Sequence, residues 1–393
     1  MKKALIIILA IILVLGFSIQ YEASTNSINF LNANSFVWFI GIAFIYLVMP
    51  IEYDKLKNKK KNEENKPEKE YKFFTANKKS ILVVALIILI AYIPYYLNYF
   101  PGNGMPDSVT EVMQAIGVQE LTNHHPAMHI LLIRLCFTIG NFLFNNYVAG
   151  YVIYMILQIL FACFTFSYAI YYMAKKKVRL PYRIITLLFF MFCPILTLYN
   201  TTLLKDVPFA LCILLYTIFY VEMTNNTEEF AKKKSRWVLL ALIILGVLFF
   251  RNNGIYVIIL SLPFLLWLAR KHYKPILVVF ILTIGIYKII TGPVYDYCGI
   301  KQGSTREALS IPLQQFARIS KYKQDSLTQE EKEKIYQYLP VENIGELYHP
   351  LSSDPVKGNF SEEGFEQDKL GLVKLYLKLA LKYPGQTIYS FVN

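Results

Sequence analysis

A series of apolar runs, each about 17 to 25 residues long and so able to cross a hydrocarbon core of about 30 Å as a helix, recurs along most of this chain. Only 17% of the 393 residues are charged, 55% are hydrophobic, and the mean hydropathy is +0.39. A soluble domain usually carries charge on about 25% of its residues. We therefore predict an all-α polytopic membrane protein, which excludes a cytosolic enzyme and a nucleic-acid-binding protein.

The net charge of +13 fits this class because the lysines and arginines gather in short segments beside the apolar runs. Such segments stay on the cytoplasmic side of a membrane. The clearest is a lysine-rich linker at 52–79, which follows a predicted N-terminal two-span hairpin at 1–51. The next span, at 80–97, then leads to an outer loop at 99–147. The predicted location is a cell membrane, with membrane lipids as surroundings.

The apolar segment 127–144 inside that loop breaks the simple alternation of spans. If it crossed, the basic cluster at 175–183 would lie outside, against the positive-inside bias. The segment also contains His129, Arg134 and Asn141. We therefore predict an amphipathic helix in the outer interface, or a re-entrant helix. The later spans are then predicted at 148–173, 184–198, 207–220, 237–250, 255–268 and 276–290.

The rest of the chain is expected to divide into two domains. Residues 80–291 form the predicted transmembrane core, and 292–393 form a mostly helical extracytoplasmic domain. In the latter, Ser326 or Thr328 is suited to cap a helix, and 370–381 has the pattern of a second amphipathic helix.

Ionisable residues are costly at a membrane edge, so each one there is a candidate for function. Asp107 follows the third span in a loop stiffened by Pro101 and Pro106. Its carboxylate can act as a general base toward an acceptor hydroxyl or amine, or bind a cation. The alternative is structural, because Asp107 or Ser108 can also cap the helix expected from Val109 onward.

A histidine cluster lies later in the same loop. His125 and His129 have the i, i+4 spacing of metal ligands, and His124 adjoins them. The other half of a known metal motif is missing, so a divalent cation stays an open alternative and no metal ligands are assigned. Hydrogen bonding to a phosphate or a sugar, or a plain polar helix start, would also explain these side chains.

Basic residues follow at other predicted outer ends of spans. Lys205 and Asp206 are expected to pair and tether two span ends, or Lys205 serves as the cation for a lipid-linked phosphate. Arg251 and Asn253 lie in an Arg-Asn-Asn-Gly connection, which suggests a tight turn or a two-pronged phosphate contact. The outer domain adds four more candidates, namely Gln314, Gln315, Arg318 and Lys357.

At these positions the sequence resembles a bacterial family of membrane proteins with the GT-C glycosyltransferase architecture. The resemblance runs from about residue 80 to the end and rests on the order and spacing of short motifs. These are Pro101-Gly-x-x-x-Pro-Asp-Ser108, Asn123-His-His-Pro126, Leu204-Lys-Asp-Val-Pro-Phe209, Phe250-Arg-Asn-Asn-Gly254, Leu309-Ser-Ile-Pro-Leu-Gln-Gln-Phe-Ala-Arg318 and Asp354-Pro-Val-Lys357.

The resemblance implies a sugar donor linked to polyprenyl phosphate, an envelope polymer or lipid as acceptor, and a GT-C-like helix bundle with its site on the extracytoplasmic face. Asp107 matches the essential aspartate of such enzymes, and 127–144 matches a juxtamembrane helix. The two spans at 1–51 depart from the pattern, and the pattern also suggests further chain beyond Asn393.

Two other classes of function remain open. A transporter or flippase of lipid-linked sugars would place ionisable groups near the bilayer midplane, whereas the predicted spans from 148 to 290 lack charges in their interiors. A non-catalytic partner in envelope assembly is the other alternative.

Overall fold

The computed structural model describes residues 75–225, 227–350 and 352–392, and within these ranges the chain is helical, with isolated β-bridges in place of strands. The predicted hairpin at 1–51 and the linker up to residue 74 lie outside the described residues. One compact unit ends at Gly303 and the next begins at Ser304. This division comes later than the expected boundary at 291/292, because Asn123 N–H donates to the carbonyl of Lys301 and ties that segment to the first unit.

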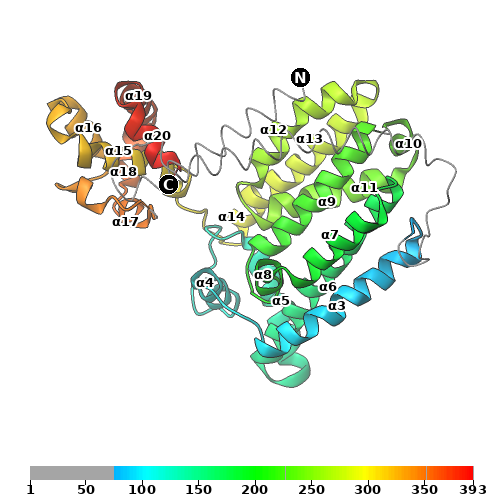
Figure 1. The fold of residues 1–393 in the computed structure, drawn as a ribbon. Helices are drawn as coiled ribbons and strands as arrows, with labels where there is room; N and C mark the ends of the chain where they lie inside the picture. Colours follow the sequence, from blue (N-terminus) through cyan, green and yellow to red (C-terminus); the bar gives the residue numbers. More distant parts are fainter. Residues whose placement is uncertain (1–74, 226, 351, 393) are drawn as a thin grey trace, which may run out of the picture. The chain divides into compact units, whose positions relative to one another are not determined.

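The first unit consists of helices that coincide with the predicted apolar segments to within a few residues (Figure 1). The predicted span 184–198 is broken, because Pro194 starts a new helix and the two parts bend by 52°. The helices are α3 (Lys78–Asn98), α4 (Pro106–Ala115), α5 (Ala127–Phe144), α6 (Tyr147–Lys175), α7 (Leu180–Phe192), α8 (Pro194–Asn200), α9 (Asp206–Asn225), α10 (Thr227–Lys232), α11 (Lys234–Phe250), α12 (Gly254–Leu268), α13 (Tyr273–Ile289) and α14 (Tyr295–Tyr297).

Five helices are long and apolar enough to cross a membrane, and the bent pair α7–α8 makes a sixth if it counts as one span. The five are α3, α5, α6, α9 and the continuous stretch Arg270–Tyr297 that contains α13 and α14. Helix α12 is also apolar, but it is shorter than these candidate spans. The all-α, multi-pass character predicted from the sequence is therefore present in the described residues.

Helices α3 and α6 pack against each other in opposite directions. Near the end of α3, the hydroxyl of Tyr92 accepts a hydrogen bond from Asn200 Nδ2 at 3.4 Å, and Gln158 of α6 donates to the Asn200 carbonyl at 3.1 Å. From this level the apolar contact surface continues back to Val84 on α3 and forward to Ile170 on α6. The end of α3 and the start of α6 therefore lie at the same end of the bundle.

Helix α5 covers only the first part of α6. Its first turn is level with Tyr154, the eighth of the 29 residues of α6, because His129 Nε2 lies 2.6 Å from the Tyr154 hydroxyl. Near the other end of α5, Gly140 packs directly on the backbone of Gly150, where no Cβ would fit. Although its length and composition would allow a crossing, α5 starts and ends at one end of the bundle. This packing supports the prediction that 127–144 does not span.

The opposite end of the bundle is held by a buried carboxylate. Glu222 of α9 forms an ion pair with Lys175 at the end of α6 and lies 3.4 Å from Arg236 at the start of α11. Glu222 is buried, and its charge is compensated by both cations. The contact gathers the basic segments at 175–183 and 232–236, both predicted to be cytoplasmic, at one end.

The second unit is a small helical domain with its own apolar core, built around Leu313, Phe316 and Tyr338. Thr328 caps its helix as expected, since its hydroxyl accepts from the N–H of Glu331 at 3.2 Å and the Glu331 carboxylate accepts from the Thr328 N–H at 3.0 Å. Its helices are α15 (Ser310–Tyr322), α16 (Gln329–Tyr338), α17 (Asp354–Lys357), α18 (Glu362–Gln367), α19 (Lys369–Lys382) and α20 (Pro384–Val392).

The antiparallel packing of α3 and α6 generates a topology prediction. In a variant without native cysteines, single cysteines at Lys79 and Lys176 should react with a membrane-impermeant thiol reagent from the same side. A cysteine at Lys301, near the other end of the bundle, should react from the opposite side. Labelling of intact cells and of inverted membranes distinguishes the sides. If Lys176 labelled from the side opposite to both Lys79 and Lys301, α5 would have to cross.

Candidate active site

Helix α4 begins earlier than the sequence suggested, which changes the role of Asp107. Pro106 occupies the first helical position, which suits its fixed φ, and Met105 is the N-cap. Asp107 is therefore in the first turn, with its carboxylate free of capping, so the alternative that Asp107 caps a helix is wrong. Ser108 carries the capping contact, because its Oγ accepts from the Met105 N–H at 2.9 Å.

Two loops that are far apart in sequence are joined beside α4. The N–H of Asn103 donates to the carbonyl of Thr201 at 2.8 Å, and the N–H of Leu203 donates back to the carbonyl of Asn103 at 2.9 Å. Ser108 Oγ also donates to the Leu203 carbonyl, and Tyr151 of α6 donates to the Asn103 carbonyl at 2.5 Å. These bonds fix the backbone before Lys205 relative to the first turn of α4.

Gly102 makes this close approach possible. Its φ of +141° lies in a region that side chains rarely adopt, and an added Cβ would collide with the side chains of Tyr151 and Met155. A residue with a side chain here would push the loop away from α6. The glycine therefore sets the position of the loop that carries Asp107.

The joined loops bring Asp107 and Lys205 together, with Nζ 2.6 Å from Oδ2. The Lys205 side chain is only 11% exposed, whereas the Asp107 side chain is 51% exposed. Lys205 Nζ also lies 3.5 Å from Oε1 of Glu111, which is fully buried. The predicted pair between Lys205 and Asp206 is wrong, because successive residues at a helix start point about 100° apart and each finds another partner.

Glu111 is the centre of a buried polar cluster. Its Oε2 lies 2.9 Å from His129 Nδ1, and its Oε1 lies 3.8 Å from His125 Nδ1. Neither carboxylate oxygen accepts a hydrogen bond of good geometry. The burial of Glu111 is therefore compensated by the charge of Lys205, and the two imidazoles line the same buried site, so removal of one of these groups affects the others.

A chain of hydrogen bonds fixes the orientation of His129. Gln158 donates from Nε2 to the carbonyls of Asn200 and Thr202, at 3.1 and 2.8 Å, so its Oε1 is the acceptor for the Tyr154 hydroxyl at 3.0 Å. The Tyr154 oxygen then accepts from His129 Nε2 at 2.6 Å. Nε2 therefore carries a hydrogen, and Nδ1 faces the Glu111 carboxylate at 2.9 Å.

The pKa values of two groups outside the spanning helices follow from this arrangement. Partial burial raises the pKa of Asp107, but the hydrogen bond and charge of Lys205 lower it by more, so this pKa lies below its ordinary value. Burial and the charge of Lys205 hold the pKa of His125 below its ordinary value, against the opposite effects of Glu111 and Asp107. At neutral pH Asp107 is ionised and His125 is uncharged.

Asp206 forms an ion pair with Arg251, at the turn between α11 and α12. The guanidinium also lies over the ring of Phe209, 5.7 Å from its centroid, and it is 44% exposed. The next residue, Asn252, donates to the carbonyl of Asn123 at 2.9 Å and so joins this turn to the histidine loop. Arg251 therefore belongs to the same end of the bundle as Lys205.

The remaining candidate residues of the first unit make fewer contacts with their side chains. His124 is exposed, although its ring packs edge to face on His125. Asn253 is exposed too, and as the N-cap of α12 it makes no capping bond with its side chain. Both face solvent beside the charged groups.

The four candidates of the second unit belong to the structure of that unit. Gln314 and Gln315 are buried and donate to backbone carbonyls, and Lys357 pairs with Glu307 and Asp354, each at 2.8 Å. Arg318 is also buried, and its guanidinium is surrounded by the rings of Tyr322, Tyr348 and Tyr389. These contacts explain the four side chains by packing within the C-terminal unit.

No set of three or more His, Cys, Asp or Glu side chains suited to a metal ion occurs in the described residues. Although His125 and His129 have the predicted i, i+4 spacing, both face Glu111, with Lys205 beside them. A lysine ammonium next to the same carboxylate disfavours a bound cation, so the pattern is explained by the buried cluster.

Three residues of the buried polar cluster were not predicted from the sequence, namely Glu111, Tyr154 and Gln158. A weak signal existed for each. Glu111 follows Asp107 by four residues and so shares its helix face. Tyr154 and Gln158 are four apart in an otherwise apolar span, where a buried amide requires partners.

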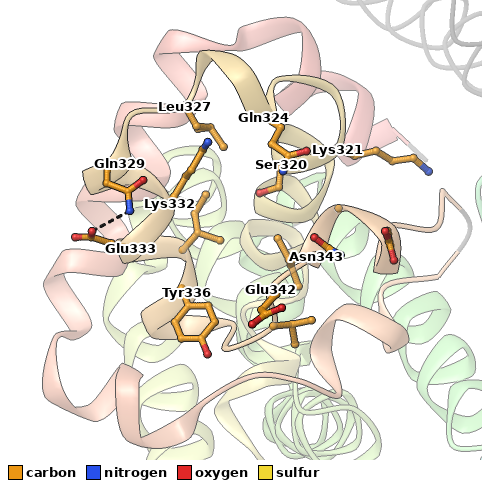
Figure 2. Close-up of a pocket in the computed structure, with 15 residues that line it drawn as sticks. Ser320, Lys321, Gln324, Leu327, Gln329, Lys332, Glu333, Tyr336, Glu342 and Asn343 are labelled. Carbon is orange, nitrogen blue, oxygen red and sulfur yellow. Dashed lines mark hydrogen bonds between the residues drawn. The ribbon is translucent and has the colours of Figure 1, made fainter.

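A cavity of about 670 Å³ lies in the C-terminal unit and is lined by residues between Ser320 and Glu346 (Figure 2). Polar side chains such as Lys321, Gln324 and Asn343 surround it, and Gln329 donates to Glu333 at 3.0 Å on its wall. None of the sequence-predicted site residues lines this cavity.

The lowered pKa of His125 predicts a pH dependence of stability. Below about pH 6.5, the unfolded chain takes up a proton that the folded His125 resists. The free energy of unfolding therefore decreases as the pH is lowered, by at most about 1.4 kcal/mol per pH unit for one proton. His125→Asn should show a smaller loss of melting temperature between about pH 7.5 and 5.5, and His124→Asn should behave like the wild type. Equal losses in all three proteins would contradict the assignment.

Comparison with known proteins gives one match. Residues 116–369 match a family described as a family of unknown function, DUF6020, and the match begins after Asp107 and Glu111. No curated protein and no solved structure matches the chain. Since the matched residues make up more than half of the sequence, the chain belongs to the DUF6020 family.

Proposed function

We propose that this protein is a membrane glycosyltransferase that moves a sugar from a polyprenyl-phosphate-linked donor to a cell-envelope acceptor at the outer face. The observation that carries the proposal is the contact between a half-exposed carboxylate, Asp107, and a mostly buried ammonium, Lys205. It combines an accessible base with a fixed cation at the end of a helix bundle. The resemblance to GT-C enzymes, in which an aspartate after a span is essential, adds to this argument.

The proposed reaction forms a bond between an acceptor oxygen and the anomeric carbon of the sugar. The bond from that carbon to the phosphate oxygen breaks, and the phosphate leaves with the electron pair. Asp107 takes the proton of the acceptor hydroxyl. Lys205 and Arg251 stabilise the negative charge that grows on the phosphate.

The low pKa of Asp107 fits this cycle only if Lys205 changes partner. Paired with Lys205, Asp107 is ionised but weakly basic. A donor phosphate competes for the same ammonium, and as the hydrogen bond to Asp107 weakens, the pKa of Asp107 rises. Glu111 keeps Lys205 charged and in place during this exchange, so we assign Glu111 as a positioning residue.

The location of buried carboxylates favours transfer over transport. In the described helices, Glu222 lies near one end of α9, and Glu111 lies on the short helix α4 at the opposite end of the bundle. A transporter of lipid-linked sugars would place such groups near the bilayer midplane. Chemistry at one membrane surface is the better explanation.

The first test compares two acids of the same loop, each paired with a lysine. Asp107→Asn keeps the shape of the side chain but cannot take a proton, so sugar transfer should fall by about 10² to 10⁴ while protein abundance stays normal. Glu120→Gln, which breaks the exposed pair with Lys301, should have no effect. The readout is the lipid fraction of a deletion strain complemented with each variant.

A polyprenyl-phosphate-linked sugar should accumulate in the deletion strain and with Asp107→Asn, and it should disappear with the wild type and with Glu120→Gln. If no lipid-linked sugar accumulated in the deletion strain, the proposed function would be wrong. If Asp107→Asn cleared the lipid as well as the wild type does, the role of Asp107 as base would be refuted.

The second test separates phosphate binding by Lys205 from its structural pairing. Lys205→Met alone leaves Glu111 buried without its cation, which should lower abundance. The double variant Lys205→Met/Glu111→Gln removes one buried charge of each sign, so abundance should recover while the lipid-linked donor still accumulates. Lys301→Met removes an exposed ammonium from the same unit and serves as control. A double variant with full activity would show that Lys205 acts only through its pairing.

A further inference from the structure

Helix α19 (Lys369–Lys382) is apolar on two faces. Leu372, Leu375 and Leu379 are buried in the core of the C-terminal unit. Four other apolar side chains are exposed, with exposed fractions of 72% for Leu370, 49% for Val373, 54% for Leu377 and 83% for Leu381. A surface helix of a soluble domain is polar opposite its buried face, so this second face requires an explanation.

The exposed residues form one continuous stripe. Their positions differ by three or four residues at each step, which places them along a single side of the helix. The stripe extends over the full length of α19, from its second residue to its second last. Scattered exposed apolar residues are normal on proteins, but an aligned set of this kind marks a contact surface.

The charges on α19 are all of one sign. Its 14 residues include four lysines and no carboxylate. Lys374 and Lys378 are exposed and follow the stripe along one flank. The buried Glu331 pairs with Lys378 at 3.3 Å and with Lys382 at 2.8 Å. Lysine stems can extend beside an apolar surface while their ammonium groups reach an anionic layer. This combination is the pattern of a helix that lies in a membrane interface.

A short linker also keeps the C-terminal unit close to the bilayer. Seven residues, 298–304, separate the end of the span-like stretch Arg270–Tyr297 from Thr305, the first helical residue of the C-terminal unit. A linker of that length reaches at most about 25 Å. A lipid surface is thus always within reach of the domain, whichever side of the membrane it occupies.

From these observations we infer that α19 lies on an anionic lipid surface, with the Leu370–Leu381 stripe in the acyl region and the ammonium group of Lys374 among the lipid phosphates. The inference is independent of the proposed transferase function, since it uses no residue of the candidate active site. It assigns the C-terminal unit a second attachment to the membrane besides its linker.

The test measures the surroundings of the stripe in the full-length protein. A nitroxide on a single cysteine at Leu377, in a variant without native cysteines, is compared with one at the exposed Glu363 of the same unit. The protein is reconstituted in vesicles of phosphatidylcholine with or without phosphatidylglycerol. Molecular oxygen reports contact with lipid, and a water-soluble nickel complex reports contact with water.

The expected result is that Leu377 is reached by oxygen more than by nickel in anionic vesicles, and that Glu363 shows the reverse. The oxygen preference at Leu377 should decrease in neutral vesicles and with Lys374→Glu. Free access of nickel to Leu377 in anionic vesicles would overturn the inference. Protection of Leu377 from both reagents would also overturn it, since a protein segment would then cover the stripe. An oxygen preference that is the same in neutral vesicles would refute the role of the anionic lipid.

Discussion

One ammonium group, that of Lys205, is shared by two carboxylates in different surroundings. Glu111 is buried, and an unpaired charge there would cost several kcal/mol, so the fold must bring a cation to it. Asp107 is half exposed and forms the shorter contact, at 2.6 Å. The surrounding structure stabilises the contact of Lys205 with the two carboxylates. The joined loops at 101–105 and 199–204, the close approach at Gly102 and the amide of Gln158 all hold the backbone before Lys205 against α4.

The two ends of the bundle use buried charge differently. At the end with the basic loops, Glu222 is enclosed by Lys175 and Arg236, so the contact serves to hold helices together. At the other end, the carboxylate of Asp107 faces solvent while its cation is buried. A polar ligand can therefore compete for the second contact from the exposed side of Asp107, whereas in the first contact the carboxylate is buried between its two cations. This asymmetry is the physical reason for placing chemistry at that end.

The course of the helices was predictable because the apolar runs have the length that a bilayer imposes, while the prediction from charge asymmetry that 127–144 does not cross awaits the labelling experiment. Partners across the fold were harder to predict. Lys205 and Asp206 are neighbours with opposite charges, yet they point to different helices. Glu111 and Gln158 are single polar residues whose importance depends on contacts between distant segments. In α15 the sequence suggested a site at Gln314, Gln315 and Arg318, but amides and a guanidinium can also satisfy a small domain core. Only their backbone and tyrosine partners distinguish the two cases.

The divergence of Lys205 and Asp206 at the start of α9 has a consequence for evolution. Lys205 is tied to α4 through two acids, so the fold would tolerate a neutral residue at 205 only together with a change at the buried Glu111, and that change would also leave Asp107 without its partner. Asp206 is paired with Arg251 on the α11–α12 turn, so a change at 206 is coupled to 251 and not to α4. Two adjacent positions in the chain should therefore vary as members of separate groups, one of three residues and one of two.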